Sequence, residues 1–129
     1  MSRGWRPDPS VWGLERREGR LFLDGHELAA LVERHGTPLY VASARALRAR
    51  CGEFARAFAG YPGPVSLHFS YKCNSVDGLL RVIHGCGLGA EVCGGHELWL
   101  ARTLGVPALA GCPLWQSARN RRAERYTPL

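Results

Sequence analysis

The chain has 129 residues, of which 46% are hydrophobic, and this is enough for one compact domain with a core. Its formal net charge of +6 comes mainly from arginines in the two end segments, so solvated ends explain the charge better than a nucleic-acid surface does. No apolar run approaches the ~18 residues of a spanning helix, and the first segment has no secretory signal, so we expect neither a membrane anchor nor export.

Five cysteines form an odd set without a C-x-x-C pair, and Cys86 and Cys93 stand too far apart for a zinc knuckle. We interpret the cysteines as reduced thiols, with Cys73 and Cys93 as small buried hydrophobic side chains. The pattern predicts a cytoplasmic protein without a metal site.

Residues 1–36 are expected to form an amino-terminal lead with one short strand and one helix. Residues 1–19 show an irregular pattern, after which residues 20–23 can form a strand that ends in an Asp-Gly turn. Apolar residues at helical spacing predict a helix over residues 26–35, and Gly36 supplies its C-terminal cap.

Residues 37–107 are expected to begin an α/β fold. A short strand over residues 39–41 is followed by a predicted helix that Ser43 caps and that runs to Phe58, with an apolar stripe along one side. The alternating run over residues 65–71 is the best strand of the chain.

A helix capped by Asn74 and Ser75 should follow this strand, then a strand over residues 90–93 and a helix over residues 97–104. Strand, helix, strand, helix with short joints indicates β/α units and a parallel sheet. A complete eight-unit barrel takes roughly 250 residues, so the chain holds about two such units. Residues 108–129 start like a further strand but continue as an irregular basic tail.

One lysine stands against sixteen arginines, and this lysine, Lys72, follows the predicted strand directly. Arginine can serve most surface roles of a cation, but it cannot lose its proton to become a nucleophile. Alternation places Ser70 and Lys72 on one face and Tyr71 on the other, at the carboxyl edge where β/α proteins collect their reactive groups. We therefore expect a reactive amine on a partly enclosed polar face, with a chance outcome of the skewed composition as the alternative.

Three other features near this edge receive a structural interpretation. His68 lies on the same face but about 13 Å before Lys72, at ~3.3 Å per residue, so we interpret it as a hydrogen-bonded interior histidine. Asn74 is read as a helix cap. The glycines between Gly85 and Gly89 have the spacing of a dinucleotide loop, but they precede a strand, so a nucleotide-binding fold is discounted.

The segment around Lys72, residues 69–75 (FSYKCNS), resembles the lysine motif of fold-type III pyridoxal-phosphate enzymes. This group contains the diaminopimelate, ornithine and arginine decarboxylases and is related to alanine racemase. Residues 36–41 (GTPLYV) and 87–92 (GLGAEV), with Glu97 and Leu98 after them, are similar to further segments of the diaminopimelate decarboxylases. The resemblance covers about residues 12–107.

The resemblance implies the first units of an alanine racemase-like (β/α)8 TIM-type barrel, preceded by short strands that belong to a β domain. It implies that Lys72 binds pyridoxal 5'-phosphate as the Schiff-base lysine of an amino-acid decarboxylase. Relatives usually carry an aspartate where Glu91 stands, so Glu91 is expected near the Lys72 amine as a cofactor-binding residue, or else as an ordinary strand-end carboxylate. The resemblance also implies a basic or dicarboxylic amino acid as the small-molecule substrate and a homodimer as in full-length relatives, and we expect no nucleic-acid or membrane partner.

Two alternatives stay open beside the decarboxylase. The phosphate loop and the carboxy-terminal β domain of full-length relatives have no counterpart in these 129 residues. The chain can therefore be a truncated or frameshifted remnant, inert by itself, and we expect little or no decarboxylation from the polypeptide alone. A racemase of the alanine type shares the lysine but fits residues 36–41 and 87–92 less well.

Overall fold

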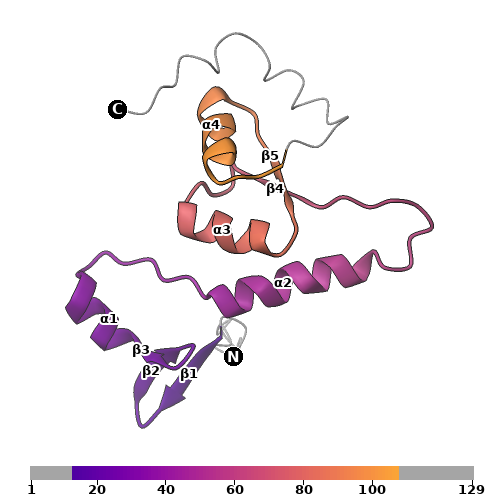
Figure 1. Cartoon of the computed structure of the whole chain (residues 1–129). Helices are drawn as coiled ribbons and strands as arrows, with labels where there is room; N and C mark the ends of the chain where they lie inside the picture. Colours follow the sequence, from indigo (N-terminus) through magenta and orange to yellow (C-terminus); the bar gives the residue numbers. More distant parts are fainter. Residues whose placement is uncertain (1–12, 108–129) are drawn as a thin grey trace, which may run out of the picture. The chain divides into compact units, whose positions relative to one another are not determined.

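The structure, a computed structural model, describes residues 13–107, and Figure 1 shows its helices and strands. The predicted basic tail over residues 108–129, with Cys112, lies outside the described residues. The chain divides after Ala46 into two compact units, each described here by itself. Between Gly13 and Pro107, no helix combines the length and apolar composition that crossing a bilayer requires.

An antiparallel sheet opens the first unit, with strands β1 (Leu14–Arg17), β2 (Arg20–Leu23) and β3 (His26–Glu27) in the order β1-β2-β3. The expected irregular lead is therefore wrong for β1. Glu18 and Gly19 link β1 to β2 with φ of 49° and 80°, the left-handed pair of a tight hairpin turn. Glutamate is an unusual residue in this conformation, which is why the turn gave no clear signal in the sequence.

The helix α1 (Leu28–His35) begins two residues later than the predicted start at His26, because His26 and Glu27 pair with β2. Gly36 ends it as predicted: its φ is 79° and its N–H donates to the Val32 carbonyl at 2.7 Å. The predicted strand over residues 39–41 is absent from the described structure, where these residues are irregular and Tyr40 is 98% exposed. Three residues without a pairing partner do not make a strand.

The helix α2 (Ala44–Ala57) agrees with the predicted helix, and the Ser43 hydroxyl accepts the Ala46 N–H at 2.9 Å, which confirms the predicted cap. Its apolar stripe is only partly buried. Cys51 is buried, but Phe54 and Phe58 are exposed within the described residues. The predicted buried face is therefore wrong at these two phenylalanines, because no described element covers them.

The second unit contains the predicted order of strand, helix, strand and helix. Its elements are β4 (His68–Ser70), α3 (Asp77–Gly85), β5 (Gly89–Glu91) and α4 (Gly95–Thr103). β4 and β5 pair in parallel, as predicted, with Ser70 opposite Glu91. β4 is shorter than the predicted strand because its partner offers only three residues, although Tyr71 still donates its N–H to the Glu91 carbonyl at 3.0 Å. The described sheets are small, and the unit is mixed α/β without a visible closed barrel.

The helix α3 begins after Val76 rather than at the predicted cap, Asn74 with Ser75. The Asn74 side-chain oxygen instead accepts the Val76 N–H at 2.9 Å. Asn74 thereby stabilises the turn that leads into the helix, a local side-chain bond typical of asparagine.

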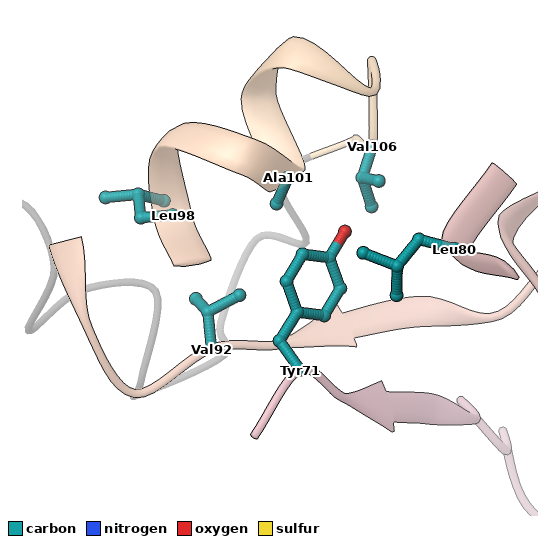
Figure 2. Close-up of a cluster of buried hydrophobic side chains, with 6 residues drawn as sticks. All are labelled: Tyr71, Leu80, Val92, Leu98, Ala101 and Val106. Carbon is teal, nitrogen blue, oxygen red and sulfur yellow. The ribbon is translucent and has the colours of Figure 1, made fainter. Parts of the chain in front are cut away.

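The core of the second unit surrounds Tyr71, the residue that follows β4. Figure 2 shows its phenol ring between side chains from α3, α4 and the segments after β5 and α4. Tyr71 is 1% exposed and Leu80 is fully buried. The other members of this cluster are Val92, Leu98, Ala101 and Val106. Burial of these apolar groups anchors the carboxyl ends of β4 and β5.

Candidate functional site at the carboxyl ends of β4 and β5

Lys72 lies in the turn that follows β4 directly. The Cys73 N–H donates to the Ser70 carbonyl at 3.1 Å, which closes this turn. Tyr71 sends its side chain into the core, so the backbone on one side of Lys72 is fixed, while Lys72 itself is exposed. The expected partly enclosed face is therefore wrong within the described residues, because no described element covers this end of β4.

Glu91, the last residue of β5, lies across from Ser70 and is half-buried. Its carboxylate accepts hydrogen bonds from the Ser70 hydroxyl and from the Cys93 thiol, the latter at 3.0 Å. The Ser70 bond, then the Cys93 bond, lowers the pKa of Glu91, with a smaller contribution from the charge of Lys72 and opposed by partial burial. The carboxylate is therefore ionised near neutral pH.

Glu91 was expected either near the Lys72 amine or as an ordinary strand-end carboxylate, and both residues lie at the carboxyl edge of the sheet. The positive charge of Lys72 acts on both Glu91 and Cys93. Within residues 13–107, however, Lys72 takes part in no ion pair. In the described part of the chain, the two predicted site residues thus influence one another by charge and form no ion pair.

Cys73 and Cys93 are exposed, so their predicted burial is wrong. Alternation along a strand does not say which face a helix will cover. The hydrogen bond to Glu91, then partial desolvation, raises the pKa of the Cys93 thiol. This thiol therefore keeps its proton and acts as the donor. The Cys93 N–H donates to the Glu97 carboxylate at 2.6 Å, which ties the residue to the first turn of α4.

The prediction of an interior histidine at His68 is wrong, because His68 is exposed. The partly buried, hydrogen-bonded histidine is His84. The His84 Nδ1 lies 2.8 Å from the Leu88 carbonyl, which can only accept, so in the neutral ring Nδ1 carries the proton. The Nε2 then accepts the Tyr71 hydroxyl at 2.7 Å. Burial raises the pKa of Tyr71, which keeps this donor protonated. The position of His84 at a helix end, before a glycine-rich turn, was the sequence signal for this contact.

A groove of about 720 Å³ lies at the opposite ends of the two strands. It is lined by residues that precede β4 and β5, among them Leu67 and Leu88, together with His84 and Val106. Reactive groups of β/α proteins collect at the carboxyl ends of strands, so this groove is distinct from the Lys72 edge. Between Gly13 and Pro107, no three His, Cys, Asp or Glu side chains gather closely enough to hold a metal ion.

Comparison with known proteins finds relatives that are named diaminopimelate decarboxylase. A diaminopimelate decarboxylase of Methanocaldococcus jannaschii is 32% identical over 99 residues, which are 74% of this chain and 23% of the relative. A diaminopimelate decarboxylase of Pseudomonas fluorescens is 42% identical over 82 residues, which are 64% of this chain and 19% of the relative. No model of a known protein family matches the chain.

A solved structure agrees with these relatives. The crystal structure of the M. jannaschii diaminopimelate decarboxylase with L-lysine superposes with a TM-score of 0.64 at 32% identity and covers 73% of this chain and 23% of that one. The chain spans about a fifth of the length of these relatives, in their amino-terminal part. Over the residues that align, the chain is therefore a homologue of the amino-terminal part of diaminopimelate decarboxylases.

Proposed function

We propose that this chain carries the cofactor-binding lysine of a pyridoxal-phosphate-dependent amino-acid decarboxylase of the diaminopimelate type. The observation that carries the proposal is the place of the chain's one lysine. Lys72 lies at the carboxyl end of β4, beside an ionised carboxylate at the end of β5, in a segment homologous to these enzymes.

The residues at this edge suit an aldehyde cofactor. Imine formation needs a primary amine that the aldehyde can reach, and Lys72 is exposed. A cationic nitrogen at this position is stabilised by a nearby negative charge, which Glu91 supplies. Lys72 would hold the cofactor, and Glu91 would support it through charge. When bound, pyridoxal phosphate supplies an electron sink for the charge that remains on the amino acid as carbon dioxide leaves.

The residues around Lys72 and Glu91 would position these two groups and leave the electron-withdrawing chemistry to the cofactor. The Tyr71 side chain, buried in the core, fixes the backbone before Lys72 and so the point from which the amine extends. The Ser70 hydroxyl holds the carboxylate of Glu91 on the same edge. Such positioning contributes to catalysis by orienting the reacting groups before the reaction.

The substrate class and assembly belong to the whole protein. We propose a diamino dicarboxylic acid as substrate, since the relatives carry that name, and a role in lysine formation, since the M. jannaschii enzyme was solved with L-lysine. Similarity to decarboxylases favours loss of carbon dioxide over racemisation. A homodimer in the cytoplasm, without nucleic acid or membrane, completes the proposal.

Reductive trapping tests the role of Lys72. The full chain is incubated with pyridoxal phosphate, reduced with borohydride and digested, and the labelled peptide is identified by mass spectrometry. We expect the label on Lys72, with the α-amino group as the other primary amine available. Lys72→Arg, which keeps the charge, should lose the side-chain label. A label confined to the α-amino group in the unmodified chain would contradict the proposal.

A gas-release assay separates this proposal from the alternatives. The 129-residue chain alone should release little or no carbon dioxide from diaminopimelate, because the Lys72 edge is exposed and water reaches it. Robust release would overturn the expectation that the isolated chain is inert. A change of chirality without gas would favour the racemase.

A further inference from the structure

The Glu91 carboxylate has a hydrogen-bond donor on each oxygen. Oε2 accepts the Ser70 hydroxyl from the neighbouring strand, and Oε1 accepts the Cys93 thiol at 3.0 Å from further along its own chain segment. Ser70 is the register partner of Glu91, so the strand pairing itself sets the first contact. With both oxygens engaged from two directions, rotation of the carboxylate is restricted.

Cys93 has no packing role that explains its presence at this position. Its side chain is exposed, whereas free cysteines of proteins are usually buried. Its backbone is nevertheless held, because its N–H donates to the Glu97 carboxylate at 2.6 Å. The thiol is thus held toward Glu91 from a fixed backbone, with the charges of Lys72 and Glu97 also acting on it.

We infer that Ser70 and Cys93 are positioning residues, which hold the Glu91 carboxylate at the edge of the sheet where the Lys72 amine emerges. Neither residue touches the cofactor in this account, and both act through Glu91. The inference deepens the proposed function and rests on it, since the position of Glu91 matters for catalysis only if Lys72 is the reacting amine.

We expect the positioned carboxylate to lower the rate at which the Lys72 amine reacts with an aldehyde. A fixed carboxylate attracts the Lys72 side chain toward this edge of the sheet, and an amine held there is less available to an aldehyde that approaches from solvent. A carboxylate held in place acts continuously, whereas a freely rotating side chain spends much of its time in water, where its effect is screened. Loss of either donor should therefore make Lys72 more reactive.

Reductive methylation with ¹³C-formaldehyde measures this reactivity without any cofactor. Lys72 and the α-amino group are the primary amines of the chain, so the α-amino group serves as an internal reference. At a fixed, near-neutral pH, Glu91→Gln should raise the relative labelling rate of Lys72 about two- to fivefold, the change expected when a weak electrostatic attraction screened by solvent is removed. Cys93→Ala and Ser70→Ala should each raise it by a smaller factor, and Cys93→Ser, which keeps a donor, should return it to the original rate.

A double-mutant cycle decides whether Cys93 acts through Glu91. In the Glu91→Gln background, Cys93→Ala should change the rate no further. An equal change in both backgrounds, or no change from Cys93→Ala or Ser70→Ala alone, would overturn the inference. Circular dichroism of each variant tests whether the fold is retained. If Ser70→Ala fails to fold, the Cys93→Ala variant still tests the inference, because Cys93 is exposed. Because no pyridoxal phosphate is used, this result is independent of the trapping experiment.

Discussion

The two units of the chain are stabilised by different kinds of interaction. In the first, residues 13–46, Leu23 alone is a buried hydrophobic residue, and much of the contact is polar, such as that of Asp24 with Ser43 and Arg45. In the second, residues 47–107, a continuous apolar cluster surrounds Tyr71.

The difference shows which unit can fix the backbone beside a reactive residue. Exposed ion pairs contribute little to stability, whereas each buried apolar side chain contributes ~1.5–3 kcal/mol. The candidate site lies in the unit with the buried cluster, and Lys72 directly follows its central residue, Tyr71. An exposed lysine thus extends from a fixed backbone, a combination that suits an amine that must meet a cofactor in one orientation.

The largest expected effect comes from opening the core of the second unit. Leu80 is fully buried, and Leu80→Ala should lower the free energy of unfolding by about 2–5 kcal/mol, because the cavity persists in a packed core. Val76→Ala, at a side chain that is 59% exposed, is the control, with an expected change within ~0.5 kcal/mol. Urea unfolding followed by circular dichroism measures both. Equal losses would show that the cluster is not the stabilising core.

Removal of the Tyr71 hydroxyl should have the next largest effect. Tyr71→Phe keeps the ring but leaves the His84 Nε2 without its donor, which should cost about 1–2 kcal/mol. Tyr40→Phe removes a hydroxyl from a side chain that is 98% exposed and should leave stability unchanged. The same urea titration compares the two variants, and an unchanged midpoint for Tyr71→Phe would contradict the assigned hydrogen bond.

Tyr71 also predicts how the second unit responds to alkali. Burial raises its pKa above the ordinary value of 10.0, so the folded state holds this proton more tightly than the unfolded state. The contribution to stability is complete below pH 10.0 and is lost as the pH rises through the folded pKa. Stability measured against pH should therefore fall less steeply in Tyr71→Phe than in the unmodified chain. Parallel curves would argue against a buried phenol.

A change in the backbone of the second unit should have an effect of similar size. Gly87 has φ of 87°, so Gly87→Ala should destabilise the turn before β5 by about 1–2 kcal/mol. Gly78→Ala, within α3 and with no atom near its added methyl group, should be neutral or stabilising by up to ~1 kcal/mol. Thermal unfolding compares the two alanine variants, and a shared direction of change would refute the left-handed assignment.

The sequence predicted the helices and the parallel strand order because their signals are local. The Ser43 cap and the Gly36 termination each depend on a few neighbouring residues. β1 was missed because its turn uses Glu18 in a conformation that glutamate rarely adopts. The strand expected over residues 39–41 failed because a strand requires a partner, which a short apolar run does not specify.

For the candidate site, too, the sequence predicted the features that depend on neighbouring residues and missed those that depend on tertiary contacts. Alternation placed Tyr71 and Lys72 on opposite faces, and in the structure Tyr71 is buried while Lys72 is exposed. The chain order placed Lys72 and Glu91 at one edge of the sheet. The hydrogen bond from Ser70 to Glu91 was not predictable, because it depends on the register between two strands about 20 residues apart. The exposure of Cys93 was also missed, since it depends on which face the helices cover.

The smallest expected effect concerns the polar contacts of the first unit. The hydrogen bond from Ser43, then the contacts with Arg45, lowers the pKa of Asp24 below 3.8, although partial burial opposes the shift. The stabilisation is therefore present above pH 3.8 and is lost as the pH falls through the folded pKa. Asp24→Asn should remove this acid dependence and weaken the first unit slightly at neutral pH.

Amide hydrogen exchange, read separately for the two units during acidification, measures this effect. Glu91 also has a lowered pKa, so the second unit weakens in acid as well, but its buried cluster should keep it protected to lower pH than residues 13–46. Asp24→Asn should bring the pH values at which the two units lose protection closer together, because it removes the acid dependence that Asp24 gives the first unit. If the second unit lost protection first, the core around Tyr71 would not be what distinguishes the two regions.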